Sequence, residues 1–162
     1  MRRNIKAAEK EIAIMDSATH LNELYEFHRQ TLTEKGRDLP YTLNELKRIM
    51  DVSAANNASK LWVARSNDAI DAIVWQVWDE TNSYYFMGGQ NPAATNYKAM
   101  SLLLWHAMKE AKKLGCKTFD LEGSMDPGVE RFFRGFGGER ALYMVLLKND
   151  SLLWKAKKIV MG

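Results

Sequence analysis

Two carboxylates near the start of the last third of the chain could perform acid–base chemistry. Asp120 and Glu122 alternate with apolar residues in a segment that predicts a strand over 117–121, so their side chains should share one face. A carboxylate at the end of a strand can accept a proton from a nucleophile. The same side chains could instead cap backbone N–H groups of the loop over 123–128, and the spacing leaves this structural role open.

Three tyrosines are candidate proton donors, namely Tyr84, Tyr85 and Tyr97. Tyrosines on a strand or an apolar helix face are more often core residues with a hydrogen-bonded hydroxyl, so this second role also stays open. Cys116 is the only cysteine, which excludes an internal disulfide and a cysteine-rich zinc site. We expect its side chain to be buried rather than to act as a nucleophile.

The three histidines predict no metal site. His20, His28 and His106 are spread over two predicted helices and form no His-Glu-x-x-His pattern, so we expect structural or surface roles for them. Ser124 follows Gly123 but lacks the Gly-x-Ser-x-Gly pattern and a nearby histidine. The sequence therefore argues against a serine hydrolase.

The composition predicts one globular domain over 1–162. Of the 162 residues, 46% are apolar and 27% are charged, which is enough to build a sizeable core. The longest apolar run, over 141–147, is far shorter than the roughly 20 residues of a membrane span, and no secretory signal follows the first residues. We therefore expect a cytoplasmic protein without stable membrane insertion.

The net charge of +3 comes from the two ends of the chain. Lysines and arginines are in excess over 1–10 and 153–162, and the body between these segments is net negative. A basic stripe that could bind a phosphate backbone is absent from the body. Sequence-unspecific nucleic-acid binding is therefore not the favoured function.

Two helices are predicted in the first third of the chain. Apolar residues recur at three- and four-residue steps over 21–32 and predict a helix that ends near Gly36. A second helix should follow Pro40. Thr42 with Glu45 three residues later predicts a capping box at its start, in which each side chain accepts from a free backbone N–H.

A third helix is predicted to start at Asn91-Pro92, with proline at the first helical position, and to stop at Gly115. By the same signal, Asp126-Pro127 predicts the start of a short helix. Both predictions rest on a side chain that accepts from first-turn N–H groups, followed by a residue without an N–H of its own.

Strands are predicted from short apolar or alternating runs between turn residues. They cover 61–64, 72–78, 84–87, 117–121 and 139–148. The first three should form an antiparallel meander, and the second is apolar on nearly every residue, which indicates a sheet covered on both faces. The resulting order ααβββαβαβ predicts an α/β fold with a mixed sheet. The lead-in over 1–15 and the basic segment over 150–162 are left unassigned.

Two strings of residues resemble a known family. The strand-end string Asp120-Leu121-Glu122-Gly123-Ser124, with the helix-and-turn string that reads VERFFRGFGG over 129–138, resembles the end of the GNAT acyltransferase fold in its FemABX-like branch. The opening string RRNIKAAEK over 2–10 is similar to the start of the second GNAT-type unit of those proteins. The predicted order of elements agrees along essentially the whole chain.

The resemblance implies transfer of an acyl group to a primary amine of a small molecule, an amino sugar or an envelope precursor. The implied donor is acetyl-CoA or another acyl-CoA, or, in the FemABX-like branch, an aminoacyl-tRNA, and neither a metal nor a covalent enzyme intermediate is needed. Relatives have two GNAT-type units and this chain has room for one. A stand-alone unit, half of a longer protein and a homodimer that rebuilds the pair are all compatible with the sequence.

The resemblance also implies where the donor and the proton acceptor should lie. A strand that splays from its neighbour would offer backbone N–H groups to the acyl carbonyl, and the helix start that follows would bind phosphates. Glycines in this strand would let a ligand approach closely. Glu122, beside Asp120, is the expected base, and Arg134 is expected to stabilise developing charge. The implied donor-binding residues are Met87, Gly88, Gly89, Gln90, Asn91, Thr95 and Asn96.

Two departures from the family pattern open alternatives. No glycine follows Gly89 in the expected phosphate-binding loop, and Phe133 stands where the FemABX-like motif has a lysine. A non-catalytic module that binds a ligand or a second unit is one alternative. Aminoacyl-tRNA-dependent transfer is the other, and it would require a basic surface for the nucleic acid.

Overall fold

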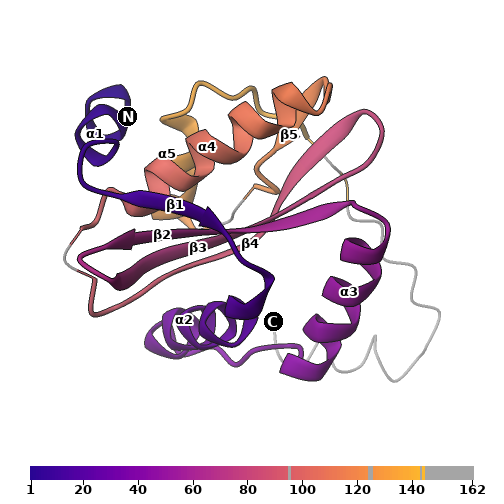
Figure 1. The fold of residues 1–162 in the computed structure, drawn as a ribbon, viewed down its shortest axis with the longest axis horizontal. Helices are drawn as coiled ribbons and strands as arrows, with labels where there is room; N and C mark the ends of the chain where they lie inside the picture. Colours follow the sequence, from indigo (N-terminus) through magenta and orange to yellow (C-terminus); the bar gives the residue numbers. More distant parts are fainter. Residues whose placement is uncertain (95, 124–125, 143, 145–162) are drawn as a thin grey trace, which may run out of the picture.

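A five-stranded sheet runs through the middle of the molecule (Figure 1). The computed structural model describes residues 1–94, 96–123, 126–142 and 144. The strands are β1 (Ala13–Asp16), β2 (Ser59–Ser66), β3 (Ala69–Trp78), β4 (Asn82–Gln90) and β5 (Thr118–Asp120). They lie in the order β1-β2-β3-β4-β5, with antiparallel pairing except between β4 and β5, which are parallel. The mixed α/β sheet predicted from the sequence is confirmed.

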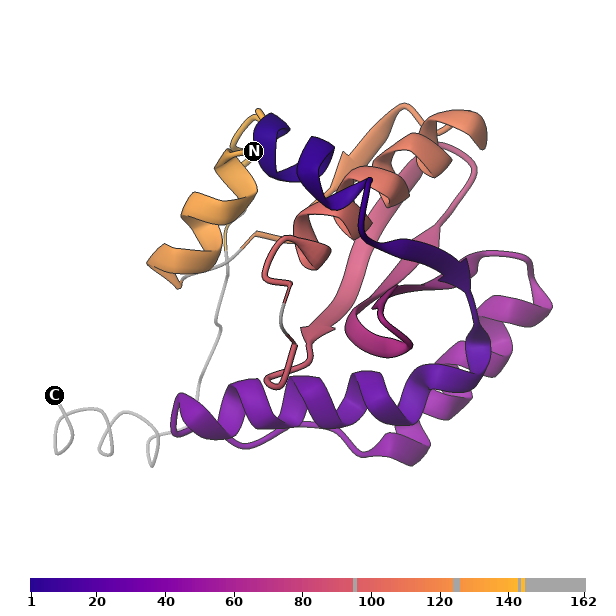
Figure 2. The ribbon, with the colours of Figure 1, turned by 60° about the vertical axis from the view of Figure 1, so that its left-hand side comes forward.

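Helices cover both faces of the sheet. They are α1 (Arg2–Ala8), the 3-10 helix η1 (Ala18–His20), α2 (Leu21–Glu34), α3 (Leu43–Ala55), α4 (Ala99–Lys113) and α5 (Pro127–Arg134). Figures 1 and 2 place α1, α4 and α5 on one side of the sheet and α2 and α3 on the other. No helix in the described part of the chain is both long enough and apolar enough to cross a lipid bilayer.

Strand β3 is the centre of both the sheet and the core. Its residues 71–76 are all buried, as the apolar sequence predicts. Ala72 and Val74 face the core closed by α1 and α4, whereas Ile73 and Trp75 face the core closed by α2 and α3. Each fully buried large apolar side chain contributes about 1.5–3 kcal/mol to folding, so these two cores hold the layers together.

A buried amide connects β3 to three neighbouring elements. Gln76 is inaccessible to solvent, and its Oε1 accepts from Nε1 of Trp62 at 2.7 Å. Its Nε2 donates to Oγ of Ser83 at 2.9 Å and to the carbonyl oxygen of Ala107 at 3.1 Å. The partners belong to β2, β4 and α4, so the network fixes how the helix sits on the sheet.

Two predicted helix starts are confirmed. Glu45 Oε2 accepts from the Thr42 N–H at 2.7 Å, and Thr42 Oγ1 accepts from the Glu45 N–H at 3.3 Å, which completes the capping box of α3. Asp126 Oδ1 accepts from the N–H groups of Gly128 at 2.8 Å and Val129 at 3.2 Å. With Pro127 as its first residue, α5 begins where the sequence predicts.

The predicted helix start at Asn91-Pro92 is wrong. Helix α4 begins at Ala99, seven residues after Pro92. The reason is the sheet: the Asn91 N–H donates to the carbonyl oxygen of Asp71 at 2.8 Å, and its Nδ2 donates to that of Ile70 at 2.7 Å. These bonds hold Asn91 in line with β3 and leave 91–98 as a turn-rich loop.

The two ends of the chain differ from the prediction in separate ways. The unassigned lead-in over 1–15 contains α1 and most of β1, which pairs with β2 as an edge strand. At the other end, residues 139–142 and 144 belong to no strand, although a strand was predicted over 139–148. The rest of that predicted strand, and the segment over 150–162, lie outside the described residues.

Candidate active site

Strands β4 and β5 diverge after a short stretch of pairing. Only Asn82 to Tyr84 pair with β5, which ends at Asp120, whereas β4 continues to Gln90. The β3–β4 register shifts at Trp75/Gln76, so Phe86 has no partner residue on β3. Beyond Tyr84, no described strand pairs with the far edge of β4, and this divergence matches the splay expected from the sequence.

Gly88 exposes its peptide groups at this open edge. Because the Asn91 N–H donates to β3, the alternation of an antiparallel ladder turns Gly89 toward β3 and Gly88 and Gln90 toward the opposite edge. The Gly88 carbonyl oxygen accepts from Nδ1 of His28 at 3.2 Å, which confirms its direction. The Gly88 N–H points to the same edge and can donate to a ligand carbonyl there.

The two glycines have a packing role that the sequence did not predict. A Cβ on Gly88 would collide with the hydroxyl and ring of Tyr85. A Cβ on Gly89 would lie 2.7 Å from Cβ of Phe27 and 3.3 Å from the backbone nitrogen of His28. The space beside the Cα atoms of both glycines, where we expected a ligand, is therefore occupied by protein atoms. Helix α2 packs directly against β4.

The loop over 91–98 uses most of its own donors. Asn91 Oδ1 accepts from the Ala93 N–H at 2.9 Å, and the Ala94 N–H donates to the Asn91 carbonyl oxygen at 2.9 Å. Asn96 Oδ1 accepts from the Lys98 N–H at 3.2 Å. The N–H groups of Asn91, Ala93, Ala94 and Lys98 are therefore engaged within the protein, and Thr95 lies outside the described residues.

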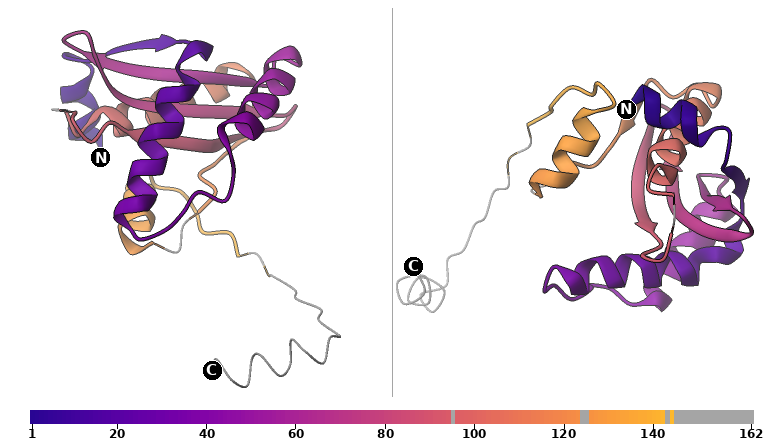
Figure 3. Two further views of the ribbon diagram at one scale, coloured as in Figure 1. Left: turned by 90° about the horizontal axis from the view of Figure 1, so that it is seen from below. Right: turned by 90° about the vertical axis from the view of Figure 1, so that its left-hand side faces the viewer.

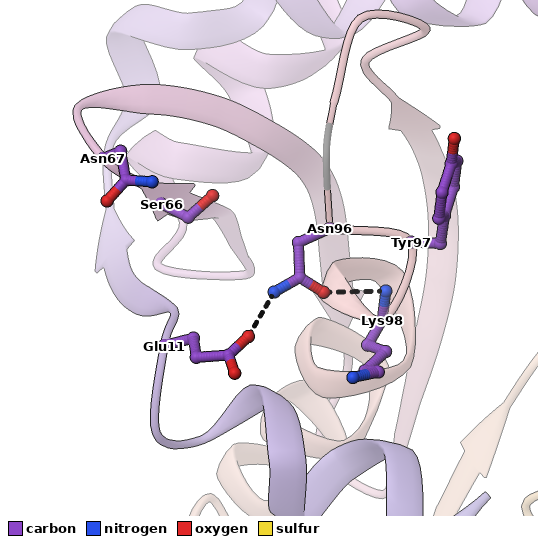
Figure 4. Close-up of a pocket in the computed structure, with 6 residues that line it drawn as sticks. All are labelled: Glu11, Ser66, Asn67, Asn96, Tyr97 and Lys98. Atoms are coloured by element: carbon purple, nitrogen blue, oxygen red, sulfur yellow. Dashed lines mark hydrogen bonds between the residues drawn. The ribbon is translucent and has the colours of Figure 1, made fainter.

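A polar cavity of about 510 Å³ opens at the start of α4 (Figure 4). Its lining residues are Glu11, Ser66, Asn67, Asn96, Tyr97 and Lys98. Asn96 bridges the cavity wall, since its Nδ2 donates to Oε2 of Glu11 at 3.1 Å. In Figure 4 the ring of Tyr97 points away from Glu11, and its side chain is 80% exposed. The start of α4 thus presents an exposed aromatic ring and a lysine.

Of the two predicted carboxylates, Asp120 has a structural role in the turn. Its Oδ1 accepts from the Glu122 N–H at 2.7 Å, and Glu122 has a left-handed backbone with φ +62°. Asp120 therefore caps a backbone N–H of this turn, but the partner is Glu122 and not a residue of the loop over 123–128. Desolvation by neighbouring atoms and the nearby Asp120 charge raise the pKa of the Glu122 carboxyl, which makes it a better proton acceptor.

Arg134 is held at the end of α5. Its guanidinium donates to both carboxylate oxygens of Glu130 at 2.7 Å, and Arg140 donates to the same carboxylate at 2.8 Å. Phe133 packs on Tyr85 with ring centroids 5.7 Å apart. No contact within the described residues brings Arg134 to Glu122, so the structure does not assemble these two predicted site residues.

The tyrosines on β4 are structural. The Tyr84 hydroxyl donates to Asp79 Oδ2 at 2.9 Å, and this bond raises the pKa of Tyr84 above its ordinary value. Desolvation raises the pKa of Tyr85 far above its ordinary value, which makes its hydroxyl a weaker acid than that of an exposed tyrosine. The described residues also bring no three His, Cys, Asp or Glu side chains together in a group that could hold a metal ion.

Comparison with known families decides the identity of this fold. The sequence model described as acetyltransferase (GNAT) domain matches residues 1–134. The chain belongs to the GNAT acetyltransferase family. No curated protein sequence matches this GNAT domain significantly.

Solved structures of acetyltransferases share the fold of this GNAT domain. A possible acetyltransferase from Clostridium difficile 630 has a TM-score of 0.67 and 11% identity, over 86% of this chain and 97% of its own. A predicted acetyltransferase with acetyl-CoA from Clostridium acetobutylicum has a TM-score of 0.65 and 16% identity, over 85% and 96%. An aminoglycoside 6'-N-acetyltransferase from Acinetobacter haemolyticus has a TM-score of 0.62 and 16% identity, over 86% and 99%.

Sequence reasoning missed one residue of this GNAT domain's open edge. His28 was expected to be structural or at the surface, but α2 places its ring against the carbonyl oxygen of Gly88. The ring of Tyr41 lies 6.2 Å from it, centroid to centroid. Because 60 residues separate His28 from Gly88, no local motif could have revealed the contact.

A salt bridge connects the two sides of the GNAT site. Lys35 Nζ, at the end of α2, lies 2.6 Å from Oδ2 of Asp126, at the start of α5. Helix α2 packs on β4, and α5 follows β5 in the chain. The bridge therefore ties the helix that carries His28 to the segment that follows Glu122. Figure 3 shows α2 running beneath the sheet toward the side on which α5 lies.

Proposed function

We propose that this GNAT domain transfers an acetyl or other short acyl group from acyl-CoA to a primary amine by direct attack. The observation that carries the proposal is the open edge of β4 beside the diverging β5, where the Gly88 N–H donates to no described residue. A backbone donor that waits for the acyl oxygen stabilises the negative charge that develops there during attack. Acetyltransferases with the same fold, one of them crystallised with acetyl-CoA, support this choice of donor.

The first turn of α4 supports phosphate binding. The N–H groups of Met100 and Ser101 donate to no described residue, and α4 is 15 residues long. Such a helix start carries partial positive charge and favours anions. Lys98, directly before the helix, adds a full positive charge. In this proposal these groups replace the glycine-rich loop that the sequence lacks.

Glu122 is the proposed acceptor of the first proton. A primary amine arrives as an ammonium ion, which must lose a proton before its nitrogen can attack. The surroundings of Glu122 raise its pKa, which makes its carboxylate a stronger base toward the ammonium ion. Glu122→Gln, which keeps the shape and removes the charge, is expected to lower transfer while leaving donor binding intact.

The finer assignments are also proposals. The strings over 2–10 and 129–138 favour the FemABX-like branch, with a single GNAT-type unit over 1–162 acting in the cytoplasm on a small-molecule, amino-sugar or envelope-precursor amine. The net negative body favours acyl-CoA over aminoacyl-tRNA as the donor. Pairing with a second copy or a second unit is part of the same proposal.

A second candidate is a GNAT-fold module that binds without turnover. The engaged donors of the loop over 91–98 favour it, because they reduce the number of groups free to bind a pyrophosphate. In that case the open edge of β4 would serve a ligand or a partner rather than a reaction.

Ligand-dependent stability separates these candidates. A ligand at about 100 times its Kd adds about 2.7 kcal/mol to the free energy of unfolding, which raises Tm by roughly 5–10 °C for a chain of this size. We expect this shift with both acetyl-CoA and free CoA, and acetylated product by mass spectrometry with a panel of primary amines. A shift without product would select the binding module, and the absence of a shift would refute the proposed donor.

A further inference from the structure

We propose that His28 is the proton relay of the acyl transfer, an inference that rests on the proposed function. The reaction needs a group that protonates the departing thiolate of CoA. The structure argues against the two strand tyrosines in this role, because the Tyr84 hydroxyl donates to Asp79, and the raised pKa of the partly buried Tyr85 makes its hydroxyl a weak proton donor. His28 lies at the open edge of β4, where the acyl carbonyl is proposed to bind.

The hydrogen bond to Gly88 fixes the state of the imidazole. A carbonyl oxygen can only accept, so Nδ1 of His28 carries the hydrogen in the 3.2 Å contact. In the neutral ring Nε2 is then the atom with a lone pair, and the one hydrogen bond of this ring to a described residue is made by Nδ1. The ring is half-buried, which leaves it open to a ligand at the strand edge. The tautomer is thus the one that can accept a proton at Nε2.

The packing of α2 holds the ring in place. Gly89 lets the helix backbone lie directly on β4, at Phe27 and His28. The salt bridge between Lys35 and Asp126 fixes the far end of the same helix. A proton-transfer group is efficient when its position is set before the substrate arrives, and both contacts supply that preorganisation.

The relay balances the protons of the reaction. Glu122 takes the first proton from the ammonium ion and releases it to solvent. The neutral nitrogen then forms the C–N bond, and its second proton moves to Nε2 of His28. The Gly88 carbonyl stabilises the imidazolium through Nδ1–H, and the imidazolium gives the proton to sulfur as the C–S bond breaks. The products are the N-acyl amine and the free thiol of CoA.

His28→Asn separates proton transfer from structure. Asparagine places an N–H₂ group near the position of Nδ1, so it can keep the hydrogen bond to Gly88 but cannot relay a proton. We expect the purified full chain to keep its Tm and its Kd for acetyl-CoA, while amine acetylation falls by about 10²–10⁴-fold. His28→Ala should lose a similar factor and regain part of it with added imidazole. His20→Asn, in a histidine bound to Ser17 Oγ at 2.7 Å, is the matched control and should keep the wild-type rate.

The outcomes are distinguishable. If the wild type acetylates an amine and His28→Asn does so within about threefold of it, His28 has only a structural role and this inference is refuted. Failure of imidazole to restore any rate to His28→Ala would also count against it. If the wild type binds acetyl-CoA and acetylates no amine, the proposed function fails, and the inference fails with it.

Discussion

Replacing Gly89 by alanine tests the link between packing and chemistry. The new Cβ would lie 2.7 Å from Cβ of Phe27, an atom that no rotamer change can move away. Ordinary carbon contacts are about 3.5–4.0 Å, so α2 must move by roughly 1 Å relative to β4. The His28–Gly88 hydrogen bond, already 3.2 Å long, would then exceed bonding distance.

Both stability and activity should respond to Gly89→Ala. Overpacking of this kind costs about 1–3 kcal/mol, and a 1 Å displacement of a catalytic group can cost about 10²-fold in rate. Urea unfolding followed by tryptophan fluorescence measures the first effect, and initial rates of amine acetylation measure the second. Gly138→Ala is the control, because no atom lies within 4 Å of the added Cβ. A Gly89→Ala protein with wild-type stability and rate would refute the proposed contact between α2 and β4.

Two further predictions concern stability. Gln76→Leu should lower the free energy of unfolding, measured in urea, by about 2–5 kcal/mol, because it leaves the buried hydrogen-bond partners of the amide unpaired. The control is Gln30→Leu on the exposed face of α2, which should change this free energy by less than about 0.5 kcal/mol. The second concerns Asp126, where Lys35 and the first-turn N–H groups lower the pKa from 3.8 to about 2. The ionised Asp126 carboxylate stabilises the folded state fully above the pKa that this group has in the unfolded chain, and the stabilisation is lost as the pH falls toward 2. The Tm difference between wild type and Asp126→Asn should therefore shrink between pH 5 and pH 2, and a constant difference would contradict this account.

The same local signal predicted one helix start correctly and one wrongly. At Asp126-Pro127 the side chain accepts from two first-turn N–H groups, and no strand competes for the segment. At Asn91-Pro92 the backbone N–H and the side chain of Asn91 both donate to β3. These bonds keep Asn91 paired with the sheet, so no helix starts there. Helix propensity and capping are local properties, whereas the hydrogen bonds that set the conformation of Asn91 come from a strand about twenty residues earlier.

Elements with strong patterns were predictable and short edge elements were not. The uninterrupted apolar run of β3 indicates burial on both faces, and the structure confirms it. Strand β1 has only four residues, and its burial pattern does not alternate. It exists because β2 offers an unpaired edge, which is information that the segment itself does not contain.

The candidate site shows the same division between local and distant information. The hydrogen bond between the Glu122 N–H and Asp120 joins residues two apart, so it is local information, although the predicted partners of Asp120 were in the loop over 123–128. The position of His28 was not predictable, because it depends on how closely α2 approaches Gly89. A lone histidine on an amphipathic helix is ordinarily a structural residue, and only the contact with Gly88 distinguishes this one.

The loop between β4 and α4 decides how much of the family's chemistry this chain keeps. Solved acetyltransferases below 20% identity share the fold with it, so the fold alone does not indicate whether the donor binds. In this chain most N–H groups of the described loop residues are engaged, whereas first-turn N–H groups of α4, beside Lys98, donate to no described residue. A pyrophosphate bound there would meet these N–H groups and the side chain of Lys98. The affinity for CoA, rather than any further likeness in fold, therefore separates an acyltransferase from a binding module.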